Sequence, residues 1–175
     1  MPTVHLRDIE TEDDVEAVMG LRRAPGQERY LGSMISHFED AIADARACPR
    51  MWSVHDAGDG TLVGFAMISD DIPQATLDAE PDYVGPYFLW RLLIDRRFQG
   101  RGYGRATIDA VAEYVRSQPR GGELLTSCRP GDGSPQPFYQ HYGFVKTGKV
   151  MWGEDILRLD LTRDPVQDAP NGGRA

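Results

Sequence analysis

The sequence predicts one α+β domain, and three observations carry that prediction. At 175 residues, with 41% hydrophobic and 9% aromatic content, the chain is long enough to bury one core. Segments with apolar residues at helical spacing alternate with short apolar runs that are typical of strands. Within residues 87–105, a strand-like run passes through a glycine loop into a helical pattern. We expect the domain to span 1–163 and to be followed by a disordered tail, 164–175, rich in Pro, Gly and Asp.

The first third of the chain predicts a strand and two helices. Apolar residues alternate with polar ones over 4–9, as in a strand with one buried face. Thr11 is placed to cap a helix whose first turn, Glu12–Asp14, is acidic and therefore suits the helix dipole. A second amphipathic pattern covers 34–45 and stops before Cys48-Pro49, which predicts a second helix.

Strands dominate the central part of the predicted fold. The runs 51–54 and 62–68 are joined through Gly58-Asp59-Gly60, which predicts a hairpin. Residues 70–86 are acidic and interrupted by prolines, so we expect a loop there. The nearly continuous apolar run 87–94 is typical of a strand that is covered on both faces.

The last part predicts a strand, a short helix and a closing hairpin. The strand covers 123–128. Pro135 suits the first turn of a helix and Gly143 its C-terminal cap. The runs 144–151 and 155–161 then pair as a hairpin that turns at 152–154.

The loop between the strand 87–94 and the next helix has the layout of a phosphate site. Its glycines let the backbone approach an anion, and the free N–H groups of the helix N-terminus point at it. Apolar residues at spacings i, i+3, i+4 and i+7 define the helix that follows: Ile108, Val111, Ala112 and Val115. A dinucleotide fingerprint and a P-loop are both excluded, because Arg105 stands where each motif requires another residue.

Two motifs resemble those of one known family. The spacing Gln99-x-x-Gly102-x-Gly104 is similar to the Q/R-x-x-G-x-G/A signature of the GNAT family of N-acetyltransferases, in which it cradles the pyrophosphate of acetyl-CoA. The segment 134–144, which ends in Phe-Tyr-x-x-x-Gly-Phe, resembles the helix-then-strand motif of the same family. The resemblance implies an acyl-CoA N-acyltransferase fold, with a mixed, mainly antiparallel sheet flanked by helices in an α+β (α/β three-layer) arrangement.

The resemblance also implies a role for each motif residue, with acetyl-CoA as co-substrate. The pantetheine arm and thioester would lie along the strand at Leu92, Leu93 and Ile94. Asp132 stands where the family usually has an asparagine that contacts the pantetheine, and Tyr139 matches the tyrosine that protonates the departing thiolate. The residues of the pyrophosphate loop would be Gln99, Gly100, Arg101, Gly102, Tyr103 and Gly104.

The acceptor is expected to be a primary amine of a small polycation. The string 87–104 looks like that of bacterial diamine and spermidine acetyltransferases, and 70–82 carries acids without lysine or arginine. We expect Glu39, Asp70, Asp71 and Tyr87 to bind this substrate. The general base is left open, because the position where some relatives have a strand glutamate is Trp90 here; a water relay to Glu39, Asp70 or Asp71 is one solution.

Other functions stay open at this point. The same chemistry could acetylate an aminoglycoside-like or streptothricin-like antibiotic or a protein N-terminus, and a non-catalytic acetyl-CoA-binding module is a further alternative. No apolar run approaches the ~20 residues needed to span a bilayer, so no membrane partner is expected. A nucleic-acid partner is not expected either. Two cysteines and four scattered histidines show no metal-ligand spacing, so no metal is expected. We expect a cytoplasmic protein, for which a homodimer is a possible assembly.

Overall fold

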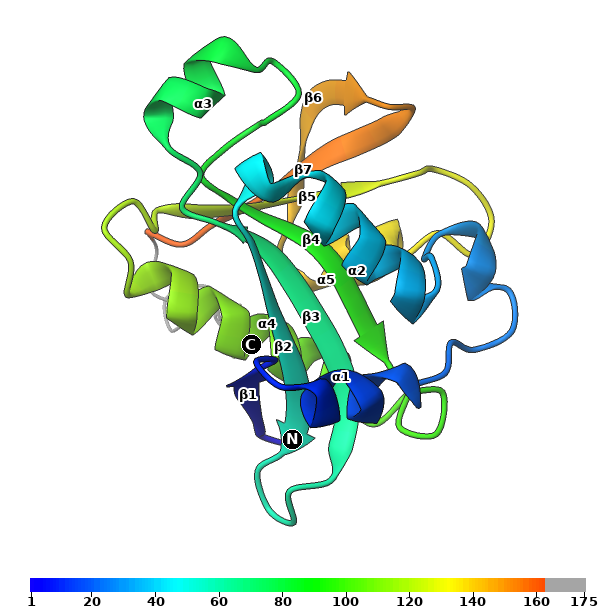
Figure 1. Cartoon of the computed structure of the whole chain (residues 1–175). Helices are drawn as coiled ribbons and strands as arrows, with labels where there is room; N and C mark the ends of the chain where they lie inside the picture. Colours follow the sequence, from blue (N-terminus) through cyan, green and yellow to red (C-terminus); the bar gives the residue numbers. More distant parts are fainter. Residues whose placement is uncertain (163–175) are drawn as a thin grey trace, which may run out of the picture.

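A seven-stranded sheet runs through the centre of the computed structural model, which describes residues 1–162 (Figure 1). In spatial order the strands run β1-β2-β3-β4-β5-β7-β6. All neighbours are antiparallel except β4 and β5, which are parallel. The strands are β1 (Val4–Asp8), β2 (Pro49–Asp56), β3 (Leu62–Asp70), β4 (Tyr87–Ile94), β5 (Glu123–Cys128), β6 (Val145–Met151) and β7 (Glu154–Asp160). The predicted mixed, mainly antiparallel sheet is therefore confirmed.

Helices cover both faces of the sheet. They are α1 (Glu12–Met19), α2 (Met34–Ala43), α3 (Gln74–Ala79), α4 (Tyr103–Arg116) and α5 (Gln136–Tyr142), with 3₁₀ turns η1 (Gln27–Arg29) and η2 (Ala45–Ala47). Phe65 and Met67 of β3 pack into a buried cluster with α1 and α2, whereas Ala66 and Ile68 join the main core with α4 and α5. Figure 1 shows α1 and α2 in front of the sheet and α4 and α5 behind it.

Local signals in the sequence account for most element boundaries. Thr11 caps α1 through a capping box with Asp14, because each side chain bonds to the backbone of the other residue. Pro135 precedes α5 and Gly143 caps its C-terminal end, as predicted. The strands expected at 87–94 and 123–128 have these bounds in the structure.

The expectation of a loop over 70–86 is wrong in part, because this stretch contains α3. Pro73 stands at the N-cap, where a proline costs no backbone hydrogen bond, and good helix formers such as Ala75 and Leu77 follow it. Pro73 therefore marks the start of a helix and does not merely interrupt a loop. The expectation of a disordered tail at 164–175 lies outside the described residues.

Asp95 fixes the position at which β4 ends and the glycine loop begins. Its side chain is fully buried, and it accepts hydrogen bonds from the Arg22 and Arg97 amides at 3.0 and 2.9 Å and from the Arg97 guanidinium at 2.8 Å. Burial alone would raise the pKa of Asp95, but the hydrogen bonds from Arg97 and Arg22 lower it below the ordinary value. The carboxylate thus ties the loop both to β4 and to the segment after α1.

We expect Asp95→Ala to lower the free energy of unfolding by about 2 kcal/mol, because the Arg22 and Arg97 amides lose the buried carboxylate that accepts their hydrogen bonds. Since the pKa of Asp95 is lower in the folded state, its contribution is present above the unfolded pKa of about 4 and is lost as the pH falls below it. Urea denaturation at pH 7 and at pH 3 measures both effects. Equal stability of the variant and the wild type at pH 7 would contradict this role.

Candidate active site

β4 and β5 separate halfway along their length. Their parallel pairing consists of Phe88 with Leu125 and Leu89 with Thr126. On the other side of β4, the register with β3 shifts at Trp90, so that this residue forms a β-bulge. The two strands therefore diverge beyond Leu89, and the rest of this edge of β4 is not covered by β5.

A cleft of about 580 Å³ occupies the gap. β4 and the glycine loop supply one side of it, β5 and α5 the other, and residues 27–32 close one end. Many of the residues predicted to bind acetyl-CoA or to act on it lie together in the lining: Leu92, Ile94, Gln99, Gly100, Gly102, Tyr103, Gly104 and Tyr139. The structure thus brings both predicted motifs to one site.

The glycine loop presents its backbone to the cleft. Gly102 is the N-cap of α4 at a φ of 89°, and no side chain caps the helix there. The first turn of α4 consequently offers backbone N–H groups and a partial positive charge to an anion. Arg105 lines the same wall, with its guanidinium 5.2 Å from the centre of the Tyr142 ring. This arrangement can hold a phosphate or diphosphate.

Gln99 has a structural role in the loop. Its side-chain amide donates hydrogen bonds to the Ile94 carbonyl oxygen at 2.8 Å and to Gln27 Oε1 at 3.0 Å. The first bond holds the loop against the end of β4, and the second holds it against η1. Gln99 therefore orders the glycines around it.

Three of the predicted cofactor-binding residues lie outside the cleft lining. Leu93 is buried on the α1 and α2 side of the sheet, because side chains alternate along β4. Arg101 is exposed, with its guanidinium 5.7 Å from the centre of the Phe98 ring. Asp132 accepts a hydrogen bond from the Tyr30 hydroxyl through its backbone carbonyl at 2.6 Å, so the loop before α5 is joined to residues 27–32.

Tyr139 is the buried phenol of the cleft. Only 7% of it is exposed, and its ring packs against Phe138 and Phe144 at centroid distances of 5.3 Å each. Burial and the neighbouring Cys128 raise the pKa of Tyr139 well above its ordinary value of 10. The hydroxyl therefore stays protonated at neutral pH and can serve as a proton donor.

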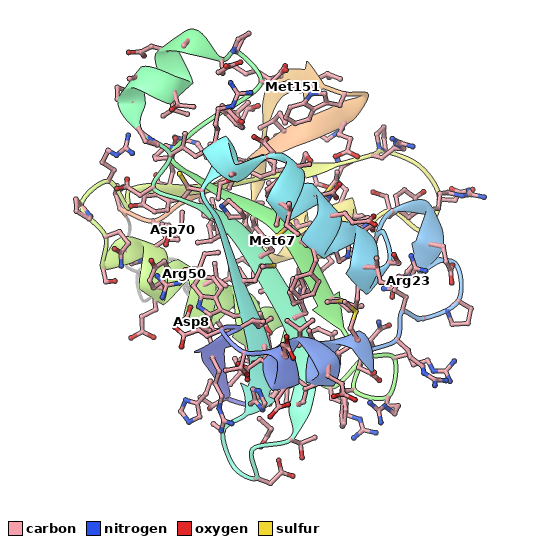
Figure 2. All side chains as sticks on the ribbon, viewed as in Figure 1. Asp8, Arg23, Arg50, Met67, Asp70 and Met151 are labelled. Carbon is pink, nitrogen blue, oxygen red and sulfur yellow. The ribbon has the colours of Figure 1, made fainter. Side chains whose placement is uncertain are left out.

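The residues predicted to bind the acceptor lie apart from the cleft. Asp70 accepts hydrogen bonds from Tyr114 at 2.6 Å and from Arg50 at 3.3 Å, and Arg50 also bonds Asp8 (Figure 2). Asp71 forms an ion pair with a guanidinium at 2.6 Å, and Tyr87 is fully buried. Glu39 is exposed on α2.

A second cleft, of about 520 Å³, adjoins the first on the α2 side of the sheet. The two clefts share the lining residues Trp90, Arg91, Ser127, Arg129 and Glu154. Among the described residues, four carboxylates, three arginines and four aromatic rings line the second cleft: Asp44, Glu80, Asp82, Glu154, Arg46, Arg91, Arg129, Tyr83, Phe88, Trp90 and Trp152. Sequence reasoning singled out the acidic stretch to which Glu80 and Asp82 belong, but no sequence signal marked Asp44 or Glu154.

The charges of the second cleft are only partly balanced within the protein. Arg46 pairs with Glu80, and Arg91 pairs with Asp40 at 2.8 Å. The Tyr83 hydroxyl donates to Asp44 at 2.5 Å. The cleft can therefore receive a cationic ligand against its acidic and aromatic walls.

The cleft between two split parallel strands, with an uncapped helix start at the glycine loop, has the geometry for an extended ligand that carries phosphate. The model of the acetyltransferase (GNAT) family matches residues 15–144, and the chain belongs to this family. It is an acetyl-CoA-dependent N-acetyltransferase, as the sequence motifs predicted.

A curated relative agrees with this assignment, and solved structures share the fold. The spermine/spermidine N(1)-acetyltransferase of Bacillus subtilis (strain 168) is 26% identical over 86% of this chain and 95% of its own length. A chimera of the Vibrio cholerae spermidine N-acetyltransferase SpeG and hSSAT has the same fold, with a TM-score of 0.60 at 16% identity over 91% of this chain and 96% of its own. An acetyltransferase from Thermus thermophilus gives a TM-score of 0.55 at 19% identity over 90% of this chain and 97% of its own.

Within residues 1–162, no helix is both long and apolar enough to cross a membrane. The same part of the chain contains no group of three or more His, Cys, Asp or Glu side chains that could hold a metal ion.

Proposed function

We propose that this acetyltransferase transfers the acetyl group of acetyl-CoA to a primary amine of a polyamine or diamine, by direct attack within a ternary complex. The observation that carries the acceptor class is the second cleft, in which, within residues 1–162, four carboxylates outnumber three arginines. Its aromatic and acidic walls meet the cofactor cleft at Trp90 and Glu154. Carboxylates attract a flexible polycation, and aromatic faces stabilise its ammonium groups. The 26% identity to a spermine/spermidine acetyltransferase supports the same class.

The cofactor would lie in the first cleft. The loop Gln99–Gly104 and the start of α4 would hold the pyrophosphate through backbone amides. The pantetheine arm would bond to the edge of β4 that β5 leaves uncovered, as an added strand would. A main-chain N–H of β4 near Leu93 would stabilise the oxyanion, and Tyr139 would protonate the leaving sulfur. A cytoplasmic location and a homodimer stay predictions of the sequence.

A turnover panel tests the acceptor class. We expect spermidine and putrescine to be acetylated with kcat/KM values at least about tenfold above those of an aminoglycoside, streptothricin or a peptide with a free N-terminus, because a carboxylate-lined cleft binds charge-dense amines best. Release of the CoA thiol measures each rate, and mass spectrometry of the product identifies the acetylated nitrogen. Turnover of an antibiotic or the peptide without turnover of either polyamine would overturn the proposal.

A further inference from the structure

We propose that Glu154 is the general base of this enzyme. The proposal rests on the amine acetylation argued above, and it assigns the one role that the sequence left open. Among the described residues that line the cofactor cleft, Glu154 is the only carboxylate. It lines the second cleft as well, so it stands where an amine would pass from one cleft into the other.

The β6–β7 turn places this side chain. Trp152 and Gly153 both have a positive φ, at 53° and 77°, and they bring Glu154 back at the start of β7, opposite Met151. The next residue, Asp155, pairs with Cys128 at the end of β5. Glu154 therefore lies just beyond the last residue pair of β5 and β7, at the end of β5 where the cofactor cleft opens.

Ser127 orients the carboxylate. Its hydroxyl donates a hydrogen bond to one oxygen, Glu154 Oε2, at 2.5 Å. Within residues 1–162 no group donates a hydrogen bond to the second oxygen, Oε1, so an amine in the cleft can approach it. Ser127 lines both clefts with Glu154 and is a positioning residue in this scheme.

The other carboxylates near the gap are placed differently. Asp44, Glu80 and Asp82 line only the second cleft, and two of them are already bonded to Tyr83 and Arg46. Asp155 follows Glu154 directly, but it forms an ion pair with a lysine at 2.6 Å. Neither set reaches the cofactor cleft.

The base and the acid face the gap from opposite sides of the sheet. Ser127 and Glu154 border the cleft on the α2 side, whereas Tyr139 belongs to α5 on the other side. An amine that enters from the second cleft thus meets Glu154 first. The sulfur of a thioester held along β4 can then depart towards Tyr139.

Glu154 and Tyr139 together account for every proton that moves in the reaction. The acceptor enters as an ammonium with three N–H protons and leaves as an amide with one. Glu154 takes the first proton and passes it to water, and the neutral nitrogen then attacks the thioester carbon to form the C–N bond. As the C–S bond breaks, Glu154 takes the second proton and the Tyr139 phenol protonates the sulfur. Glu154 releases that proton to solvent and Tyr139 regains one, so the net release is one proton.

Glu154→Gln tests the assignment, because glutamine can still accept the hydrogen bond from Ser127 but cannot take a proton. We expect kcat at pH 7 to fall by about 10²-fold or more, as for the loss of a positioned base. Since only amine that is already neutral could then react, kcat/KM of the variant should rise about tenfold per pH unit from pH 7 to 9, more steeply than for the wild type. Calorimetry with CoA should give an unchanged Kd.

Two controls accompany this variant. Asp155→Asn removes the neighbouring carboxylate and should keep a kcat close to the wild-type value. Ser127→Ala should lower kcat by a smaller factor than Glu154→Gln and leave the steepness of the pH profile as in the wild type. An amine-independent readout is the slow hydrolysis of acetyl-CoA, in which water replaces the amine and needs the same base.

The possible outcomes distinguish an error in the acceptor class from an error in the role of Glu154. If the wild type acetylates another amine instead of polyamines, the acceptor class is wrong, and Glu154→Gln is measured with that amine. If no amine reacts, the hydrolysis rates decide. Wild-type rates and pH profile for Glu154→Gln overturn the role of Glu154, and so does a higher KM for the amine at unchanged kcat, because that result would make Glu154 a binding group only.

Discussion

Replacing Tyr139 with phenylalanine is expected to lower kcat by about 10²-fold or more, because the thiolate loses the group that protonates it as the C–S bond breaks. The pKa of Tyr139 is raised well above 10 by burial, so the wild-type phenol carries its proton throughout the neutral range. The ring contacts with Phe138 and Phe144 involve no hydroxyl, and phenylalanine preserves them. The Kd for acetyl-CoA should therefore stay the same.

Tyr142→Phe is the matched control for this experiment. Tyr142 lies on the same helix, three residues further on, and its hydroxyl donates to Asp109 at 2.7 Å. Its loss removes a phenol near the site without removing the one that lines the cleft. Steady-state kinetics and calorimetry should give near-wild-type values for Tyr142→Phe. Equal kcat values for Tyr139→Phe and the wild type would exclude Tyr139 as the acid.

The cofactor side of the site could be predicted from the sequence because its signals are contiguous. Gln99, Gly102 and Gly104 lie within six residues, so one motif read along the chain locates the strand end, the loop and the helix start together. Tyr139 follows from a second short motif between Pro135 and Gly143. Both motifs are local, and the sheet then brings them to one cleft.

The acceptor side could not be predicted in the same way. Glu154 and Ser127 are far apart in the sequence, and they meet because β5 pairs with β7. They border the cofactor cleft because β4 and β5 diverge after Leu89. Neither the pairing of β5 with β7 nor the divergence of β4 and β5 is marked by a local sequence pattern. Asp70 and Asp71 looked suitable by composition, but composition does not reveal that arginines already neutralise both.

Gly102→Val is expected to weaken acetyl-CoA binding by about 100-fold or more, because the backbone conformation that presents the amides of α4 is lost. Gly102 has a φ of 89°, and a Cβ there would meet Pro2 Cδ at 3.1 Å. A side chain at this φ costs roughly 1–2 kcal/mol in strain, so the variant should also unfold at lower temperature. Loss of affinity and loss of stability therefore have to be separated.

Gly148→Val is the control that separates loss of affinity from loss of stability. Gly148 has nearly the same φ, 85°, with nothing within 4 Å of an added Cβ, and it lies on β6 away from both clefts. Both variants should lose stability in thermal denaturation through the same backbone strain, and Gly102→Val somewhat more, because its added Cβ also meets Pro2. Only Gly102→Val should lose binding when a folded sample is titrated with CoA. A wild-type Kd for Gly102→Val would remove the loop from the cofactor site, whereas an equal loss of affinity in both variants would attribute the effect to the fold rather than to the loop.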